Sequence, residues 1–402
     1  MDVVIIGNGI AGNAAAQAAL RHPKARVTLV DRSSLPFHSA CVLPDYIADS
    51  LQSDVVILKP LSSRRFKRIL GEEIQAIDPL EQKIVTKKKT IPYDKLILAT
   101  GSRPSIPSVP GAGLAGNFCL KHLGDAELIR QFPARKALVV GSGLIGLEVA
   151  AALKKRGQSV TVIENQDRLG PRIFDPPVAT YVQKILEGHG IRFGVGESVT
   201  EILGKNQVKT IKTSKRELKR DLVIWAVGMQ PESRLAWEAG LKLGNQGGLI
   251  VGKSLETSQT GIFSAGDVTE FPDPLFAGSR LNLFWYFGAS QGRVAGLNSV
   301  GIRSEFPPTL QMGTARLFDT TLVFVGYTGV ELQEIGLSPE TQDLTTKHRF
   351  LHKVFLNGGL VGLQMVNPLR HEILMANQVL RTPKAGSPIP WYLKRLYSHH
   401  TG

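Results

Sequence analysis

The sequence predicts an α/β protein with two parallel, doubly wound sheets, because one local pattern occurs twice along its 402 residues. In each copy a short apolar run is followed by three glycines with G-x-G-x-x-G spacing, a helical stretch rich in alanine, and a second apolar run. A strand, a tight turn, a helix and a parallel strand in this order form a nucleotide-binding βαβ unit. Two copies therefore predict two nucleotide-binding domains in one chain.

The first copy begins with the apolar run 2–6 and turns at residues 7–12. Its first glycine permits the tight turn, the second lets the backbone approach a pyrophosphate, and the third lets the helix pack closely on the strand. The helix start offers free N–H groups to phosphate. An acid is expected about 20 residues later to hold ribose hydroxyls, and Asp31 lies 19 residues after Gly12. The residues predicted to contact this dinucleotide are Gly7, Gly9, Ala11, Gly12, Asp31 and Arg32.

The second copy has strands at 137–140 and 160–163, with a helix at 147–155 between them. Its acid, Glu164, lies 18 residues after Gly146. A carboxylate in this position accepts hydrogen bonds from both ribose hydroxyls and repels a 2′-phosphate. No basic residue adjoins Glu164, and Arg168 is the nearest one, so the sequence favours NADH over NADPH. The predicted contacts are Gly141, Gly143, Ile145, Gly146 and Glu164.

Composition excludes several classes of protein. No apolar run reaches the roughly 20 residues that span a bilayer, and no secretory signal pattern opens the chain, so we expect a cytoplasmic protein. Cys41 and Cys119 are the only cysteines, too few for a disulfide framework. The nine histidines show no ligand spacing, so no protein-bound metal is predicted. We assign Cys119 to packing in a strand.

The net charge of +14 has two interpretations. Basic residues concentrate at 64–68, 87–89 and 212–220, yet no nucleic-acid-binding module accompanies them, so no nucleic-acid partner is predicted. One interpretation is a solvated basic surface. The other is electrostatic steering of an acidic protein partner.

Proline and glycine clusters mark the candidate domain crossings, at 104–113, 227–231 and 306–308. Beyond the third crossing, residues 309–380 indicate strands and one helix, with a hairpin over 352–366 that turns at Asn357, Gly358 and Gly359. Residues 383–402 are first proline-rich and then basic and aromatic, which is typical of an extended tail.

Three further segments identify a family resemblance: 97–104 (Ile-Leu-Ala-Thr-Gly-Ser-Arg-Pro), 226–228 (Ala-Val-Gly) and 262–267 (Ile-Phe-Ser-Ala-Gly-Asp). Together with the two glycine turns, they resemble the pyridine nucleotide-disulfide oxidoreductase superfamily. The resemblance implies two interleaved Rossmann-like domains and a small α+β C-terminal domain. FAD would occupy residues 1–107 and 229–306, NAD would occupy 108–228, and 307–402 would form an interface domain with an extended tail.

The resemblance also implies roles for single residues. Asp267 would bind the ribityl or phosphate region of the flavin, and Glu148 would lie near the flavin as a catalytic residue. An ordinary surface role for Glu148 and a core-packing role for Trp285 remain alternatives. The further residues implied to contact FAD are Ala99, Thr100, Gly101, Arg103, Gly266 and Trp285, and Gly228 is implied to contact NAD.

Two branches of the superfamily fit the remaining residues. The segment 38–47 resembles the branch whose single cysteine cycles beside the flavin, which includes coenzyme A disulfide reductase and NADH oxidase. Cys41 would then be catalytic, with its thiolate stabilised by the helix start at Leu43-Pro44. The alternative role for Cys41 is packing beside the flavin. Ile10 replaces a histidine of the oxidase and peroxidase members, which argues against peroxide chemistry.

The other branch contains rubredoxin reductases and flavin subunits of iron–sulfur complexes, and the first glycine turn and the short C-terminal domain resemble it. Our leading hypothesis is therefore electron transfer between NAD(H) and an acidic iron–sulfur or rubredoxin-type partner through FAD. The second is NADH-driven disulfide reduction or oxidase chemistry at Cys41. A third is a sensing or assembly subunit with structural FAD. The tail residues 391–397 are a candidate docking strap, and a homodimer through the C-terminal domain stays open.

Overall fold

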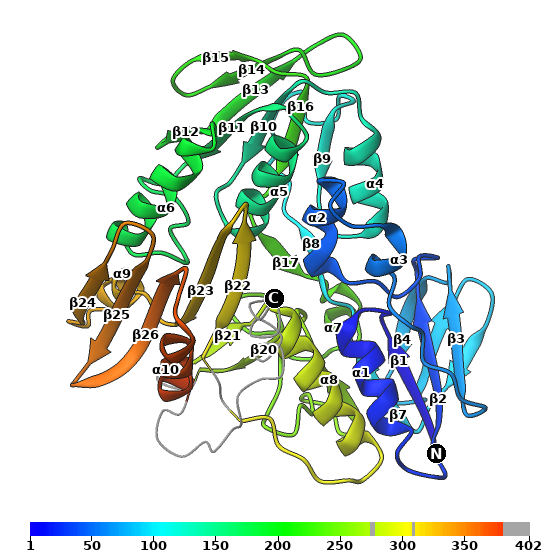
Figure 1. Cartoon of the computed structure of the whole chain (residues 1–402). Helices are drawn as coiled ribbons and strands as arrows, with labels where there is room; N and C mark the ends of the chain where they lie inside the picture. Colours follow the sequence, from blue (N-terminus) through cyan, green and yellow to red (C-terminus); the bar gives the residue numbers. More distant parts are fainter. Residues whose placement is uncertain (274–277, 308–309, 381–402) are drawn as a thin grey trace.

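The computed structural model describes residues 1–273, 278–307 and 310–380, and it confirms the α/β class (Figure 1). Two parallel sheets and one antiparallel sheet, each of five strands, form the three main units. The unit that contains the N-terminus lies at the lower right of Figure 1, the second parallel sheet lies at the top, and the antiparallel sheet lies at the left. No helix among the described residues is long and apolar enough to cross a membrane. A cytoplasmic location stays a prediction.

The first parallel sheet has the strand order β19-β7-β1-β2-β3. Its central strand β1 is buried on both faces, which explains the continuous apolar run at the start of the chain. Strand β19 joins this sheet only after the chain has built the whole second unit, so the first unit is discontinuous in sequence. The strands are β1 (Asp2–Ile6), β2 (Arg26–Asp31), β3 (Phe66–Leu70), β7 (Lys95–Leu98) and β19 (Ile262–Ser264).

The second parallel sheet repeats this arrangement with the order β12-β11-β10-β16-β9. Cys119 ends the edge strand β9 and packs, partly buried, against an apolar cluster around Leu138 and Trp225. The strands are β9 (Asn117–Cys119), β10 (Lys136–Val140), β11 (Ser159–Glu164), β12 (Arg192–Val195) and β16 (Leu222–Trp225). Its helices are α4 (Leu123–Gln131), α5 (Leu144–Lys155) and α6 (Pro176–Gly188).

The two crossings between the parallel sheets lie side by side. Strand β8 (Ser102–Pro104) leaves the first unit, and β17 (Met229–Pro231) returns to it. The two pair antiparallel, with Gln230 opposite Arg103. Both crossing segments were predicted from their proline and glycine content, but their pairing was not. The domain boundaries themselves stay a prediction.

The antiparallel sheet has the order β22-β23-β26-β25-β24, and α10 packs on β23 and β26. It confirms the predicted hairpin, because β25 and β26 pair across a turn at Asn357 and Gly358. The predicted tail, with its candidate docking strap, lies outside the described residues. The elements are β22 (Met312–Leu317), β23 (Thr320–Gly326), α9 (Gly329–Glu334), β24 (Glu340–Thr345), β25 (Phe350–Leu356), β26 (Gly359–Val366) and α10 (Arg370–Leu380).

Smaller elements complete the described chain. A 3₁₀ turn, η1 (Ala40–Val42), leads into two short helices beside the second sheet, α2 (Leu43–Ile47) and α3 (Ser53–Val56). The other elements are β4 (Ile74–Asp78), β5 (Lys83–Thr86), β6 (Thr90–Pro92), β13 (Val199–Leu203), β14 (Thr210–Thr213), β15 (Glu217–Lys219), α7 (Arg234–Glu238), β18 (Leu249–Ile250), β20 (Thr269–Pro272) and β21 (Ser279–Leu281).

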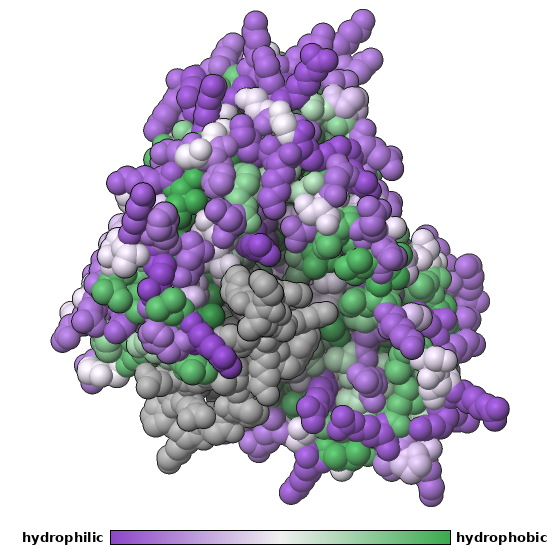
Figure 2. Space-filling model, viewed as in Figure 1, coloured by the Kyte–Doolittle hydropathy of each residue, from purple (hydrophilic) through white to green (hydrophobic). Residues whose placement is uncertain are grey.

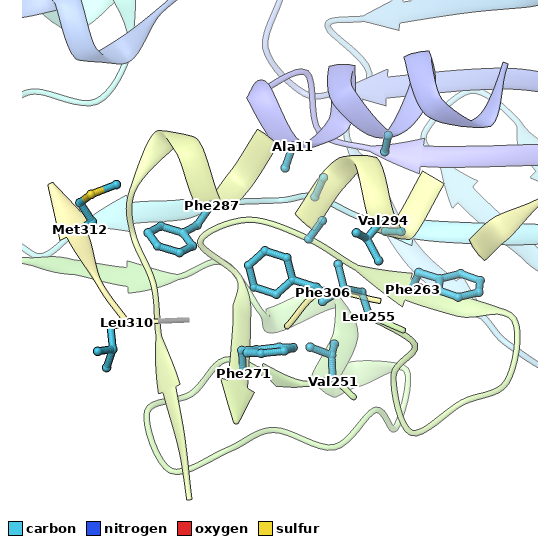
Figure 3. Close-up of a cluster of buried hydrophobic side chains, with 14 of the residues drawn as sticks. Ala11, Val251, Leu255, Phe263, Phe271, Phe287, Val294, Phe306, Leu310 and Met312 are labelled. Atoms are coloured by element: carbon cyan, nitrogen blue, oxygen red, sulfur yellow. The ribbon is translucent and has the colours of Figure 1, made fainter. Parts of the chain in front are cut away.

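Helix α1 (Ile10–Ala19) is held against α8 (Trp285–Ser299) by backbone contact (Figure 1). A Cβ added to Gly292 would lie 2.1 Å from the Ala11 carbonyl oxygen, and one added to Gly296 would lie 2.3 Å from that of Ala15. The glycines therefore let the two helices touch without side chains between them. Below them, Figure 3 shows an apolar cluster in which Phe271 meets Phe306 edge to face, with ring centroids 5.0 Å apart.

A buried charged network joins the second parallel sheet's unit to the antiparallel sheet. Asp175, just before α6, contacts Nε2 of His352 on β25 at 2.9 Å, and Nδ1 of His352 contacts Asp343 on β24 at 2.5 Å. Asp175 also accepts hydrogen bonds from Gln364 and from the backbone N–H of Gly329. Burial by itself lowers the pKa of His352, but the two carboxylates outweigh it and raise the pKa, so the imidazole is held charged.

The first prediction concerns the α1–α8 contact. Gly292→Ala forces the helices apart, and we expect it to lower the free energy of unfolding by about 1–3 kcal/mol. Thermal unfolding followed by circular dichroism measures this change. Gly188→Ala is the matched control, because the exposed end of α6 leaves open space for the methyl group. Equal unfolding temperatures for the two variants would contradict the packing argument.

The second prediction concerns His352. Replacing it with Gln leaves Asp175 buried without its cation, which costs about 3 kcal/mol. Because the folded pKa is raised, this contribution is fully present below the unfolded value of about 6.5 and is lost as pH rises through the folded pKa. Unfolding midpoints of wild type and H352Q should therefore differ most at mildly acidic pH and converge in alkali. His371→Gln, at an exposed site on α10, is the control. A constant gap across pH would refute the assignment.

Candidate functional site

One large cavity collects residues from all three units. Its volume is about 2220 Å³, whereas a pocket for one small ligand has about 300–1,000 Å³. The two glycine turns, at 7–12 and 141–146, lie on its wall together with the ends of β2 and β11. The cavity therefore has room for two dinucleotides, one from each turn.

The first glycine turn is fixed by backbone contacts. Gly7 has a φ of +120°, and a Cβ there would lie 2.0 Å from the Ala99 carbonyl oxygen. A Cβ on Gly12 would lie 2.0 Å from the Gly7 oxygen, so helix and strand pack as the spacing predicted. The Asp31 carboxylate, at the end of β2, accepts the N–H of Asn8 at 2.6 Å and that of Ser33 at 2.7 Å.

The second glycine turn repeats this geometry. Gly141 has a φ of +99°, and a Cβ there would lie 2.4 Å from the Ala226 oxygen. Glu164 accepts the N–H and the hydroxyl of Ser142, at 3.0 and 2.7 Å. The guanidinium of Arg168 lies on the wall but is engaged by the carbonyls of Phe174 and Pro171 and by the Asp167 carboxylate.

The middle glycine of each turn differs from the first and third glycines, because the protein leaves space for a side chain at this position. A Cβ on Gly9 or on Gly143 would meet no protein atom within 4 Å, and both residues line the cavity. The protein's own packing therefore does not require glycine at these two positions. Glycine is required there only if a bound group lies directly against the backbone, and a pyrophosphate binds in this way.

Between the two turns, the wall carries Cys41 on η1 and Glu148 on α5. The Cys41 side chain is exposed to the cavity but deeply placed. Burial raises the pKa of its thiol to about 12, the Glu148 and Asp267 carboxylates add to the rise, and Lys121 opposes it. The pKa of this thiol therefore rises at the helix start rather than falling, mainly because of burial, and α2 has only five residues.

Glu148 is also perturbed. Burial raises the pKa of its carboxyl group to about 8, and the Asp45 carboxylate on α2 adds to the rise. Glu148 is therefore mainly protonated at neutral pH. Beside it, Lys121 reaches from the end of β9 into the first unit, where its Nζ lies 3.0 Å from Oδ2 of Asp267 and 2.9 Å from Oγ of Ser102.

Residues 1–292 match the model of the pyridine nucleotide-disulphide oxidoreductase family, which agrees with these features. The chain belongs to this family. The chain is similar to an NADH oxidase of Methanocaldococcus jannaschii, with 32% identity over 82% of this chain and 76% of the relative. A rubredoxin-NAD(+) reductase of Pseudomonas putida is 31% identical over 85% of this chain and 94% of the relative.

The solved structure of an NAD-dependent persulfide reductase from A. fulgidus is also similar, with a TM-score of 0.89 and 28% identity over 94% of this chain and 76% of that one. The chain is thus an FAD- and NAD-dependent oxidoreductase. Both glycine turns fit this conclusion, because each has the open middle glycine and an acid at the end of the second strand.

The structure brings most of the predicted site residues together on the cavity wall. Gly12 and Gly146 lie just behind it and pack the helices on the strands. Arg103 is the exception, because it lies off the wall and pairs with Glu232 at 3.2 Å. The predicted residues that line the cavity are Gly7, Gly9, Ala11, Asp31, Arg32, Cys41, Ala99, Thr100, Gly101, Gly141, Gly143, Ile145, Glu148, Glu164, Gly228, Gly266, Asp267 and Trp285.

Sequence reasoning missed Asp45, Lys121 and Ser142 as parts of the site. Ser142 lies inside the second glycine turn, so its neighbour Glu164 could have indicated it. Lys121 and Asp45 carry no local signal, since each acts on a residue of another element. Within the described residues, no group of three or more His, Cys, Asp or Glu side chains could hold a metal ion.

The third prediction separates the two turns. A methyl group on Gly9 enters open space, so Gly9→Ala should leave the apoprotein's unfolding temperature unchanged but lower its FAD content. Gly143→Ala should retain FAD and weaken NADH binding about tenfold, which corresponds to a loss of about 1.4 kcal/mol in the free energy of binding. The flavin-to-protein absorbance ratio and NADH titration measure the two effects. The assignment fails if Gly9→Ala instead weakens NADH alone.

Proposed function

We propose that this oxidoreductase passes electrons from NADH through FAD to an iron–sulfur or rubredoxin-type protein that accepts one electron at a time. The supporting observation is the environment of Cys41, whose thiol is deeply placed with the carboxyl groups of Glu148 and Asp267 nearby. A thiol–disulfide relay needs a thiolate, and a pKa of about 12 leaves almost none at neutral pH. The second cysteine, Cys119, belongs to a strand of the other unit and packs in its own apolar cluster.

In this proposal the residues of the chain bind the two cofactors and orient them. The turn 7–12 and Asp31 hold FAD, and the turn 141–146 and Glu164 hold the nicotinamide nucleotide. When bound, FAD accepts two electrons as a hydride and releases them singly, which links NADH to a one-electron carrier. Lys121 and Ser102 hold the Asp267 carboxylate in place. Trp285 lines the cavity, and the ring of Phe37 stacks parallel to its ring.

NADH is the proposed donor rather than NADPH. The Glu164 side chain lines the cavity and is oriented by hydrogen bonds from Ser142 and from the backbone N–H of Gln166. A 2′-phosphate would lie against the Glu164 side chain, and the Arg168 guanidinium nearby is already engaged by other protein groups.

The net charge of +14 supports an acidic partner. Figure 2 shows hydrophilic residues over most of the viewed face, densely over β13–β15 at the top. In this region Lys215 and Lys219 are exposed, whereas the guanidinium of Arg216 pairs with the buried Glu197 carboxylate. By contrast, Arg65 of the predicted cluster at 64–68 binds carbonyls at the end of α1. Part of the basic charge therefore has a structural role, and the remainder steers the partner. The name of the rubredoxin-NAD(+) reductase relative agrees with such a partner.

Thiol chemistry at Cys41 remains the second candidate, because one observation favours it. The sulfur faces the cavity rather than the protein core. A substrate disulfide could therefore reach it, and the persulfide reductase resemblance points the same way.

The fourth prediction separates the two functions. Cys41→Ser should keep at least about half of the NADH-dependent turnover with a ferredoxin or rubredoxin, because no bond to sulfur forms in that path. The turnover is measured as the reduction of cytochrome c by the reduced carrier. The same assay with NADPH in place of NADH compares the two donors. Cys119→Ser is the matched control. Loss of turnover with every acceptor in Cys41→Ser, with FAD still bound, would establish the thiol function instead.

A further inference from the structure

Two carboxyl groups lie on one stretch of the cavity wall, Asp45 on α2 and Glu148 on α5. The two helices pack against each other, and both side chains are partly exposed to the cavity. Among the described residues, neither side chain has an ion-pair or hydrogen-bond partner that would offset its charge. Two carboxylates in such a place cannot both be ionised cheaply, because their repulsion adds to the cost of burial.

The electrostatics of Glu148 agree with this geometry. Burial is the larger influence on its pKa, which rises to about 8, and the Asp45 carboxylate is the second. Other charged groups face the same part of the cavity: Asp267 and Lys121, which pair with each other, and the thiol of Cys41. Lys121 is engaged by Asp267 at 3.0 Å, and in the described part of the chain it makes no ion pair with Asp45 or Glu148.

One face of α5 runs from Glu148 to the exposed Lys155 at the end of the helix. On α5, the side chains of Glu148, Ala151, Ala152 and Lys155 share one face, at helical spacing, and all four line the cavity. Facing them are Arg316 of β22 and Asp319 of the following turn. Lys155, Arg316 and Asp319 are exposed, whereas Ala151 and Ala152 are small and buried. We name this stretch, from Glu148 to Lys155 and Asp319, the α5 groove.

We propose that Glu148 holds a proton beside the Asp45 carboxylate and delivers this proton to the flavin site when NADH reduces it, and that the proton released on reoxidation leaves along the α5 groove. The proposal rests on the electron-transfer function proposed above. It gives Glu148 a defined chemical task and makes Asp45 a positioning residue, which acts by keeping its neighbour protonated.

Protons and electrons balance in this scheme. NADH leaves as NAD⁺ and delivers two electrons with one proton, and Glu148 supplies a second proton and becomes a carboxylate. When two one-electron acceptors remove the two electrons, both protons are released. One returns to Glu148 and the other leaves through the α5 groove, so one proton reaches solvent for each NADH oxidised.

The experiment is infrared spectroscopy of the FAD-loaded protein, which detects the carbonyl stretch of a protonated carboxyl group. In the oxidised wild type, we expect a buried carboxyl signal at neutral pH that disappears with a midpoint of about 8. Reduction by NADH should bleach this signal. Glu148→Gln should abolish it, and Asp45→Asn should lower its midpoint while leaving it above that of an ordinary carboxyl, because burial remains.

A matched control is Glu187→Gln, at an exposed position of α6, which should change neither the signal nor its midpoint. A merely structural role for Asp45 would leave the midpoint of Glu148 unchanged. The proposal is overturned if the signal is absent at neutral pH, survives Glu148→Gln, keeps its midpoint in Asp45→Asn, or persists after reduction by NADH.

This test is independent of the acceptor. If the protein failed to reduce iron–sulfur carriers but showed the Glu148 signal and its bleaching, the electron-transfer proposal would fall and the proton store would stand. If iron–sulfur carriers were reduced but no Glu148 signal appeared, the electron-transfer proposal would stand and the proton store would fall.

Discussion

The contact of backbone against backbone around helix α1 is the constraint on which the rest of this structure depends. One side of α1 touches the first glycine turn through Gly12, and another side touches α8 through Gly292 and Gly296. No side chain fits at these contacts, so the start of α1 cannot shift relative to β1. A fixed helix start is what presents N–H groups to phosphate at a constant position. The apolar cluster in Figure 3 supports α8 from the other side.

The second unit repeats this arrangement, and the two crossings place the copies toward one shared cavity. Strands β8 and β17 pair across the junction, so both crossings form a single ribbon rather than two independent linkers. The Lys121–Asp267 ion pair adds a contact between the units at the cavity wall. At the far side, the charged network of Asp175, His352 and Asp343 fixes the antiparallel sheet to the second unit. The three units thus close around the site through these polar contacts and through apolar clusters that span the units.

The chemistry of the cavity follows from which ionisable groups lie close together on its wall. Cys41, Asp45, Glu148 and Asp267 bring one thiol and three carboxyl groups to one wall, against the single cation Lys121 in the same stretch of described residues. Such a wall favours protonated groups over anions. It therefore disfavours a resting thiolate, and it suits a site that stores a proton beside its electrons.

The sequence by itself determined the two glycine turns, the acid that follows each, the crossing segments and the C-terminal hairpin. Each of these is a local arrangement, encoded by residues within about 25 positions of one another. The sequence could not determine the protonation of Cys41 and Glu148, the position of Arg103 off the cavity wall, or the reach of Lys121 into the first unit. Those features arise between elements far apart in the chain, where burial and neighbouring charges act through space. Only the tertiary structure buries Glu148 and brings Asp45 beside it, and burial and proximity together favour a proton over an anion on Glu148.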